Sequence, residues 1–402
     1  MRLSKFAIWC VVYCAAVVRL LGNGFLALMR ISLWPRRRPL QPERICVYRI
    51  GAIGDLICAT PALYAIRRAY PNARLTLLTT PGKYSRSRHA EELMAGVAWL
   101  DEIISYDLDE IRSFRNRIAF GQKLRAHKFD AWFDLTLDRA KFFRMIRDML
   151  IARLLGARWG YGWRLEHLGF AARAEAAVRE FPDEVERLAL RLYSCGITGD
   201  ATIFPPFLDQ LRVSDLHAIE ACARPLVAIA PGARRPCNLW PNERFAEVSE
   251  NLIATGAAVF LIGGDDDSAA CADIAARAGD RPINLAGKLS LREARALLRR
   301  CDLLICVDSG PQHLAASVGT RCVAIFSQRN QRRRWYPHGR QHVVLEGSVP
   351  CHTCLLDVCP HRNRCMNQIT VEQVLAAARC VLPMAIRSRA PNHRFERPSV
   401  MH

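Results

Sequence analysis

The chain begins with two apolar runs, residues 6–18 and 20–34, separated by Arg19; Asn23 and Arg30 lie within the second run. A helix spanning a bilayer would bury Arg19 near its centre, at a cost of about 3 kcal/mol on insertion scales. A segment in the membrane interface avoids most of this cost, because arginine side chains can reach the headgroups. The pattern predicts a membrane-associated segment over residues 1–40 and leaves spanning and interfacial placement open.

The charges around this segment predict its orientation. Arg30 and residues 36–38 supply more positive charge after the apolar runs than Arg2 and Lys5 supply before them. Positive flanks stay on the cytoplasmic side, so we expect the rest of the chain at the cytoplasmic face of the inner membrane. A cleaved signal peptide is the alternative, but no convincing small-residue cleavage site ends the first run.

From Arg44 onward, short apolar runs alternate with helical patterns. Residues 45–50 predict a buried strand, residues 56–70 a helix and residues 74–79 a second strand, which together form one βαβ unit. The same rhythm predicts further strands over residues 102–106, 131–135, 226–230, 258–262, 303–307 and 321–326, and helices over 241–255, 291–300 and 311–318. This alternation is typical of parallel α/β sheets.

Length and turn-rich segments divide the pattern into domains. At 402 residues the chain fits two ordinary cores. We predict an α/β protein with two Rossmann-like, doubly wound domains over residues 41–215 and 216–385, facing a central cleft. Residues 386–402 are rich in Arg, Pro and Asn and predict a disordered basic tail.

The net charge indicates which classes of partner the protein binds, and the cysteines indicate its redox compartment. The formal net charge is +19, which favours anionic partners such as phosphates, acidic membrane surfaces or nucleic acid. The sequence lacks zinc-finger, RRM and base-reading helix patterns, so nucleic acid is the least favoured of these. Most of the 16 cysteines lie scattered in apolar runs, as expected of buried thiols in a reduced compartment.

The first motif of chemical interest joins the strand over residues 45–50 to the following helix. It contains Gly51, Gly54, Asp55 and Thr60-Pro61 after Arg49. Backbone N–H groups at such a helix start can bind an anion. The motif has two glycines where the dinucleotide fingerprint has three, so it is weak evidence for a nicotinamide cofactor. From spacing alone, Asp55 is equally a helix cap or a general base.

Two further motifs follow strands of the second half. Pro231, Gly232 and Ala233 precede Arg234 and Arg235, which are either solvated or placed to meet phosphate oxygens. Asp308, Ser309, Gly310 and His313 form a strand-to-helix turn suited to a diphosphate. Without other information, Asp308 as a helix cap and His313 as a packed side chain are slightly favoured.

Two clusters complete the candidate chemistry. Residues 309–345 contain no acidic residue and six arginines, which form either a solvated face or a phosphate-binding surface: Arg321, Arg329, Arg332, Arg333, Arg334 and Arg340. Four cysteines lie within 15 residues, Cys351, Cys354, Cys359 and Cys365. Their intervals depart from the usual paired zinc knuckles, so a structural zinc is the less favoured reading and free or partly paired thiols the more favoured one.

Taken together, these motifs resemble glycosyltransferase family 9, the ADP-heptose:lipopolysaccharide heptosyltransferases, over residues 44–382. The resemblance implies a GT-B fold with an N-terminal acceptor domain and a C-terminal donor domain. It also implies inverting transfer of heptose from ADP-heptose to a lipopolysaccharide core or related lipid-linked glycan, with no catalytic metal or other required cofactor. Two alternatives are another nucleotide-sugar donor on the same fold and a catalytically impaired binding subunit of glycan assembly.

The resemblance also assigns roles to residues. Asp55 is expected to be the base, and Asp265 or Asp266 to lie near the donor ribose. The remaining candidates for donor binding are Gly54, Gly232, Ala233, Arg234, Arg235, Asn238, Asp308, Ser309, Gly310 and His313. The family often carries a lysine two residues before the Trp240-Pro241 pair, where this chain has Asn238. Arg234 or Arg235 is expected to replace that lysine.

Overall fold

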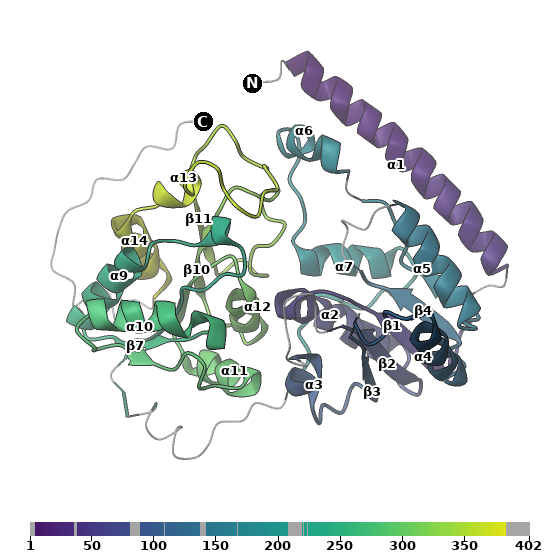
Figure 1. Ribbon diagram of the computed structural model, residues 1–402, viewed down its shortest axis with the longest axis horizontal. Helices are drawn as coiled ribbons and strands as arrows, with labels where there is room; N and C mark the ends of the chain where they lie inside the picture. The colour runs from purple at the N-terminus through teal and green to yellow at the C-terminus, as the bar shows by residue number, and fades with distance from the viewer. Residues whose placement is uncertain are drawn as a thin grey trace.

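The computed structural model describes residues 5–35, 38–80, 89–107, 109–136, 142–166, 168–207, 219, 221–222 and 224–382. The tail over residues 386–402, the boundary between residues 215 and 216, and Arg36 and Arg37 lie outside the described residues. The two halves of the chain each form a parallel β-sheet flanked by helices (Figure 1). The α/β architecture predicted from the sequence, with two doubly wound halves, is confirmed.

The N-terminal half contains a five-stranded sheet with the order β3-β2-β1-β4-β5. Its strands are β1 (Arg44–Tyr48), β2 (Arg74–Thr79), β3 (Glu102–Ser105), β4 (Ala131–Asp134) and β5 (Gly160–Tyr161). All strand pairs are parallel. Because β1 lies between β2 and β4, the winding direction changes at β1, and the carboxyl ends of β1 and β4 form the usual ligand-binding edge.

Helices flank this sheet. They are α2 (Ile53–Ala69), α3 (His89–Met94), α4 (Phe114–Ala126), α5 (Phe142–Leu154), the short η1 (Gly169–Ala171), α6 (Ala172–Ala176) and α7 (Glu184–Tyr193). The helix α2 begins directly after β1, so the first candidate motif lies at the edge where ligands bind.

The C-terminal half contains a six-stranded sheet with the order β11-β10-β9-β6-β7-β8. Its strands are β6 (Leu226–Ala230), β7 (Ala258–Leu261), β8 (Ile283–Asn284), β9 (Leu303–Val307), β10 (Cys322–Phe326) and β11 (Val343–Glu346). The helical segments are η2 (Pro236–Asn238), α9 (Asn242–Ala254), η3 (Asp265–Asp267), α10 (Ser268–Arg277), α11 (Leu291–Arg300), α12 (Gly310–Ser317), α13 (Arg364–Asn367) and α14 (Val371–Val381). Here the winding changes between β6 and β9, and the second and third candidate motifs follow those two strands.

The two halves pack directly against each other. One cluster of buried apolar side chains runs across both, from Ile45 and Leu63 to Ala228 and Leu304. The helices α2 and α12 lie side by side where the halves meet (Figure 1). Because both helices begin at the ligand-binding edge of their own sheet, this packing brings the two edges together.

The N-terminal apolar runs form one continuous helix, α1 (Lys5–Leu33), along the outside of the N-terminal half (Figure 1). Arg19 does not interrupt it, because its guanidinium pairs with Glu175 of α6. Residues Phe6–Leu33 are long and apolar enough to cross a membrane by length and composition.

Candidate active site between the two halves

The N-terminal ends of α2 and α12 meet through two glycines. A Cβ atom added to Gly54 would lie 2.9 Å from Cδ2 of His313 and 3.6 Å from the Cα of Gly310. A Cβ atom on Gly310 would lie 2.9 Å from Cγ2 of Ile53. Glycine at both positions therefore permits the close approach of the two helix starts. The partial positive charges of both helix N-termini point to the same region, which favours an anion there.

Asp55 lies in the first turn of α2, and its surroundings fix its position. Its Oδ2 atom accepts a hydrogen bond from the Ala52 N–H at 2.6 Å. The buried Arg49 side chain donates to the Asp55 carbonyl oxygen from Nη2 at 2.8 Å and from Nε at 3.1 Å. Burial raises the pKa of the Asp55 carboxyl, although Arg49, the Ala52 N–H and Arg234 oppose the shift. One oxygen thus serves the helix start, and the raised pKa makes the group a better base.

His313 lies on α12 and faces the N-terminal half. Its Nδ1 atom is 3.2 Å from the Cys58 sulfur of α2, and its ring meets Trp335 edge to face. Burial lowers the pKa of His313 to about 4, so the imidazole is neutral at physiological pH. A neutral ring can hydrogen-bond a phosphate but adds no positive charge.

Asp308 follows β9 and is held by amide side chains. Asn238 donates to the Asp308 Oδ2 at 3.0 Å and to its carbonyl oxygen at 3.1 Å, and Gln312 donates to Oδ1 at 3.2 Å. Asn238 is 1% exposed and also accepts a hydrogen bond from the Ser327 hydroxyl. Burial raises the pKa of Asp308 to about 6, with Arg235 and Arg329 acting against the shift. Asn238 therefore fixes the conformation of the Asp308 loop through hydrogen bonds to both the backbone and the side chain of Asp308.

The turn after β6 carries the cationic side chains of the site. Arg234 is exposed, and its charge acts across the boundary between the halves on Asp55. Arg235 lies close enough to Asp308 to lower its pKa and pairs with Asp357 at 2.9 Å. Ala233, between Gly232 and these arginines, packs partly buried against the apolar core of the C-terminal half. The Ser309 hydroxyl bonds the Val307 carbonyl at 3.4 Å instead of capping α12.

Carboxylates of η3 lie beside this turn. A Cβ atom on Gly232 would lie 1.9 Å from Oδ1 of Asp267, so only glycine fits beneath that side chain. Asp267 also accepts the Gly264 N–H at 3.0 Å. Asp265 and Asp266 are both exposed. The expectation that Asp265 or Asp266 lies near the donor ribose stays a prediction, and the neighbouring Asp267 contacts Gly232 where β6 and β7 end.

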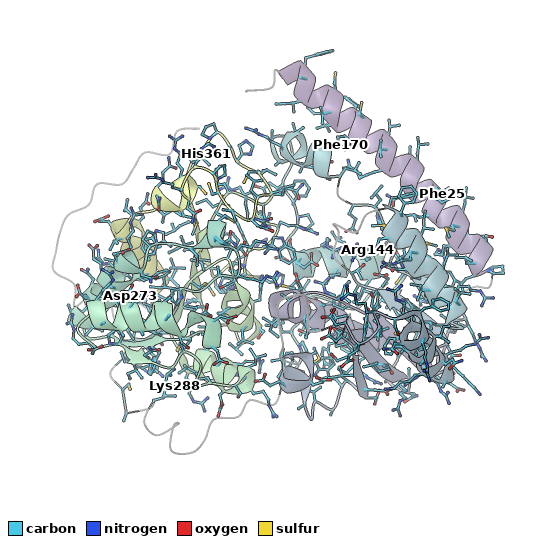
Figure 2. The ribbon with its side chains drawn as sticks, in the orientation of Figure 1. Phe25, Arg144, Phe170, Asp273, Lys288 and His361 are labelled. Carbon is cyan, nitrogen blue, oxygen red and sulfur yellow. The ribbon has the colours of Figure 1, made fainter. Side chains whose placement is uncertain are left out.

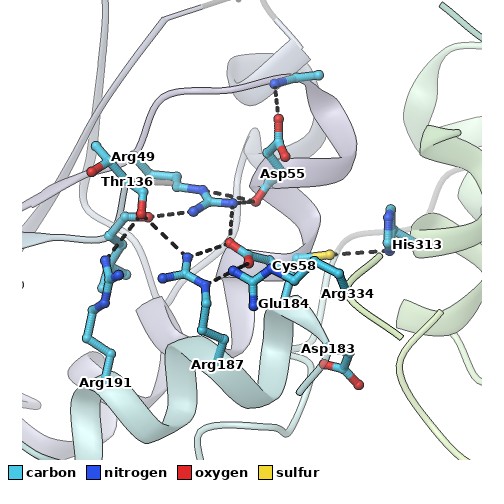
Figure 3. Close-up of polar contacts among 12 residues, drawn as sticks. Arg49, Asp55, Cys58, Thr136, Asp183, Glu184, Arg187, Arg191, His313 and Arg334 are labelled. Atoms are coloured by element: carbon cyan, nitrogen blue, oxygen red, sulfur yellow. Dashed lines mark hydrogen bonds and ion pairs between the residues drawn. The ribbon is translucent and has the colours of Figure 1, made fainter. Parts of the chain in front are cut away.

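A buried ion-pair cluster lies next to Asp55 and joins the two halves (Figure 3). At its centre is Glu184 of α7, 1% exposed, which contacts Arg49 at 3.0 Å, Arg187 at 2.6 Å and Arg334 at 3.2 Å. Burial opposes the Glu184 charge, but these arginines outweigh it and hold the pKa well below its usual value. Arg334 comes from the C-terminal half, so Glu184 links that half to the residue that holds Asp55.

Two further ion pairs connect the two halves near Glu184. His338 pairs with Asp183 at 2.8 Å and Arg333 with Glu180 at 2.9 Å. Within the predicted arginine surface, Arg329 pairs with Asp357 and Arg332 with Glu346. Four of the six arginines form ion pairs within the protein and Arg321 and Arg340 are exposed, so phosphate binding by this run stays a prediction.

The four cysteines of the C-terminal cluster all lie in the part of the chain that the structure describes. Cys351, Cys359 and Cys365 are partly buried and Cys354 is exposed. Among the described residues, no group of three or more His, Cys, Asp or Glu side chains is arranged to hold a metal ion. A structural zinc at these thiols stays a prediction, and no role in the candidate site rests on one.

The arrangement suits transfer of a group from a phosphate-bearing donor. A carboxylate of raised pKa lies on one half, and two converging helix N-termini with Arg234 and Arg235 supply positive potential. A base on one side and anion stabilisation on the other are the two requirements of an inverting displacement.

Comparisons with known proteins agree with this geometry. The family model for glycosyltransferase family 9 (heptosyltransferase) matches residues 117–364. Lipooligosaccharide heptosyltransferase 2 of Haemophilus ducreyi is 34% identical over 344 residues, covering 77% of this chain and 94% of the relative. Lipopolysaccharide heptosyltransferase 3 of Escherichia coli K12 is 28% identical over 292 residues, covering 68% of this chain and 79% of the relative.

Solved structures share the fold. The glycosyltransferase family 9 protein of Veillonella parvula has a TM-score of 0.65 at 20% identity, covering 85% of this chain and 97% of that one. The E. coli ADP-heptose lps heptosyltransferase II has a TM-score of 0.59 at 22% identity, covering 84% and 98%. With more than half of its residues matched by the family model and a 34% identical relative aligned over most of both chains, this protein belongs to glycosyltransferase family 9, the heptosyltransferases.

Proposed function

We propose that this protein transfers heptose from ADP-heptose to the core of lipopolysaccharide, or to a related lipid-linked glycan, at the cytoplasmic face of the inner membrane. The family relatives are lipopolysaccharide and lipooligosaccharide heptosyltransferases, which supports the sugar and the acceptor class. The observation that carries the proposal is the close approach, at Gly54 and Gly310, of the start of α12 to the start of α2, whose first turn carries Asp55.

In the proposed reaction, Asp55 takes the proton from the acceptor hydroxyl. The hydroxyl oxygen forms a bond with the anomeric carbon of the heptose while the bond from that carbon to the diphosphate breaks. ADP leaves with the electron pair, and its negative charge is stabilised by the N–H groups of α12 and by Arg234 and Arg235. The Oδ1 atom of Asp55 is the one assigned to the proton, because Oδ2 accepts the Ala52 N–H. No catalytic metal is needed for these steps.

The test is the Asp55→Ala variant with purified protein, ADP-heptose and a delipidated acceptor. Loss of a general base lowers the transfer rate by about 10²- to 10⁴-fold, whereas ADP affinity should stay within twofold of wild type. Asp109→Ala is the matched control, because Asp109 is exposed and lies before α4, outside the site. An Asp55→Ala enzyme with wild-type turnover would remove the base assignment. A panel of other nucleotide sugars, with products detected by mass spectrometry, decides the donor.

A further inference from the structure

The helix α1 has its polar and apolar faces reversed relative to a helix on a soluble protein. Its charged and amide side chains, Arg19 and Asn23, are turned toward the N-terminal half and partly buried. The opposite face carries exposed apolar side chains, which we call the outer face of α1: Phe6, Trp9, Tyr13, Val17, Leu20, Leu21, Phe25, Leu28 and Ile31. A soluble helix turns such side chains to the core, so the outer face requires an apolar environment.

The inner face of α1 contacts the N-terminal half from Ala15 to the end of the helix. Arg19 pairs with the fully buried Glu175 carboxylate. The Asn23 amide donates to the Leu165 carbonyl at 3.0 Å and accepts the Leu165 N–H at 2.7 Å. Near the end of the helix, the Trp34 indole donates to the Ala157 carbonyl at 2.7 Å. If α1 crossed a bilayer while keeping these contacts, Glu175 and the Leu165 backbone would enter the hydrocarbon, which is strongly unfavourable.

The apolar surface continues from α1 onto neighbouring elements. The Phe25 ring lies 5.8 Å from the Phe142 ring of α5, and Phe142 lies 5.8 Å from Phe143, which is 81% exposed. On η1, which contacts α1, Phe170 is 63% exposed (Figure 2). With 29 residues, α1 is about 43 Å long at 1.5 Å per residue. A strip of this length and composition is typical of helices that lie in the plane of a membrane.

The charges beside the strip match an anionic lipid surface. Residues 1–42 contain seven Lys and Arg residues and no acidic residue. At the end of α1, Arg30 and Arg38 line a hollow of about 410 Å³ together with Trp34, Trp159 and Tyr161. Arginines beside an exposed apolar strip attract the anionic headgroups of a bilayer.

We propose that α1 is a monotopic anchor, with its outer face in one leaflet of an anionic bilayer and its inner face on the N-terminal half. This placement resolves the choice between spanning and interfacial positions in favour of the interface. The anchor would hold the half that carries Asp55 at the membrane, where a lipid-linked acceptor lies. Only this link to the acceptor rests on the proposed function.

The first test is flotation of the full chain with vesicles of phosphatidylglycerol and phosphatidylethanolamine. Wild type should float, and Leu21→Glu/Leu28→Glu should lower the partition constant by about a hundredfold or more, since burying one leucine side chain changes such a constant by about tenfold or more. The matched control is Phe114→Glu/Ile118→Glu on α4, which also replaces two exposed apolar residues and should float like wild type. Circular dichroism should show an unchanged fold, because the substituted side chains lie on the surface.

Two outcomes of this test would overturn the proposal. One is flotation of the α1 variant equal to that of the control. The other is a wild-type dimer in lipid-free solution that becomes monomeric in the α1 variant, which would assign the outer face to a second copy of the chain. Transfer to a delipidated acceptor is measured in parallel and should be unchanged in the α1 variant. Absence of transfer in wild type would count against the proposed function alone.

The second test distinguishes an interfacial helix from a spanning one. A tag fused before residue 1 should be digested, together with the two sheet-containing halves, when protease is added to sealed inside-out membrane vesicles. A tag that stays protected while the halves are digested would mean that α1 crosses the bilayer, and the monotopic placement would be wrong.

Discussion

Replacing Glu184 with glutamine tests whether one buried carboxylate holds the two halves together and fixes Arg49, which in turn supports Asp55. The Glu184 carboxylate contacts the guanidinium groups of Arg49, Arg187 and Arg334 within 3.2 Å and is 1% exposed. Glutamine has nearly the same shape but lacks the charge, and its NH₂ group would face an arginine donor. The substitution therefore leaves several guanidinium groups without their main counter-ion in a site from which water is excluded.

Removing one partner of a buried ion pair typically lowers the free energy of unfolding by about 3–5 kcal/mol. Glu180→Gln is the matched control, because Glu180 also pairs with an arginine of the C-terminal half, Arg333, at 2.9 Å, but is 73% exposed. An exposed pair contributes about 0–1 kcal/mol. Urea unfolding followed by tryptophan fluorescence measures both variants, and the midpoint of Glu184→Gln should shift several times further.

The lowered pKa of Glu184 also predicts how the stability of the protein depends on pH. Because the pKa of Glu184 lies below its unfolded value, its contribution to stability is present above about pH 4.5 and is lost as the pH falls through the lowered pKa. Transfer should slow as well, since Arg49 holds the Asp55 backbone. Equal midpoint shifts for Glu184→Gln and Glu180→Gln at pH 7 would refute the central role of Glu184.

Three further predictions follow from particular contacts. Gly54→Ala places a methyl group 2.9 Å from His313 and should destabilise the protein by about 1–3 kcal/mol in thermal unfolding, whereas Gly24→Ala meets no atom within 4 Å and should be neutral or stabilising. Burial lowers the pKa of His338, but Asp183 outweighs this and raises it above 6.5; the pair therefore stabilises below about pH 6.5 and loses its effect as the pH rises through the raised pKa. His338→Gln should accordingly reduce the unfolding free energy by about 0.5–1 kcal/mol at pH 6 and leave it unchanged at pH 9; an equal reduction at both values would exclude the charged pair. Asn238→Ala removes a buried donor to Asp308 and should lower the free energy of unfolding by about 1.5–3 kcal/mol. It should also weaken ADP binding in calorimetry. Unchanged values would mean that the Asp308 loop keeps its conformation without the Asn238 hydrogen bonds.

The sequence predicts the central elements of the fold well, because strands buried on both faces appear as short apolar runs. The runs at 226–230 and 303–307 coincide with β6 and β9. The helices α5 and α7 are not among the predicted elements, although α7 carries apolar residues at helical spacing, Val185, Leu188 and Leu192, and a capping box of Asp183 and Glu186. Arg19 was read as an interruption of the N-terminal apolar segment, because its partner Glu175 lies 156 residues away in the sequence.

Some residues of the candidate site can likewise be predicted from the sequence, and others cannot. Asp55, Ser309 and Gly310 can be found from the sequence, since each lies where a buried strand gives way to a helix. Glu184 cannot, because nothing in its local pattern distinguishes a buried carboxylate from an ordinary residue in the first turn of a helix. Asp267 carried a usable signal: of the three aspartates after Gly263 and Gly264, it is the one at the third helical position, where a side chain turns back to the preceding backbone.

The attachment of α1 to only one half of the molecule has a mechanical consequence. Arg19 and Asn23 bind segments of the N-terminal half, which also carries Asp55. On a lipid surface, that half would be the stationary part of the protein, and a movement between the halves would displace the C-terminal half instead. In the proposed reaction, ADP would then leave toward the aqueous side, while the lipid-linked glycan, diffusing in two dimensions, would meet an Asp55 side chain that keeps a constant height above the bilayer.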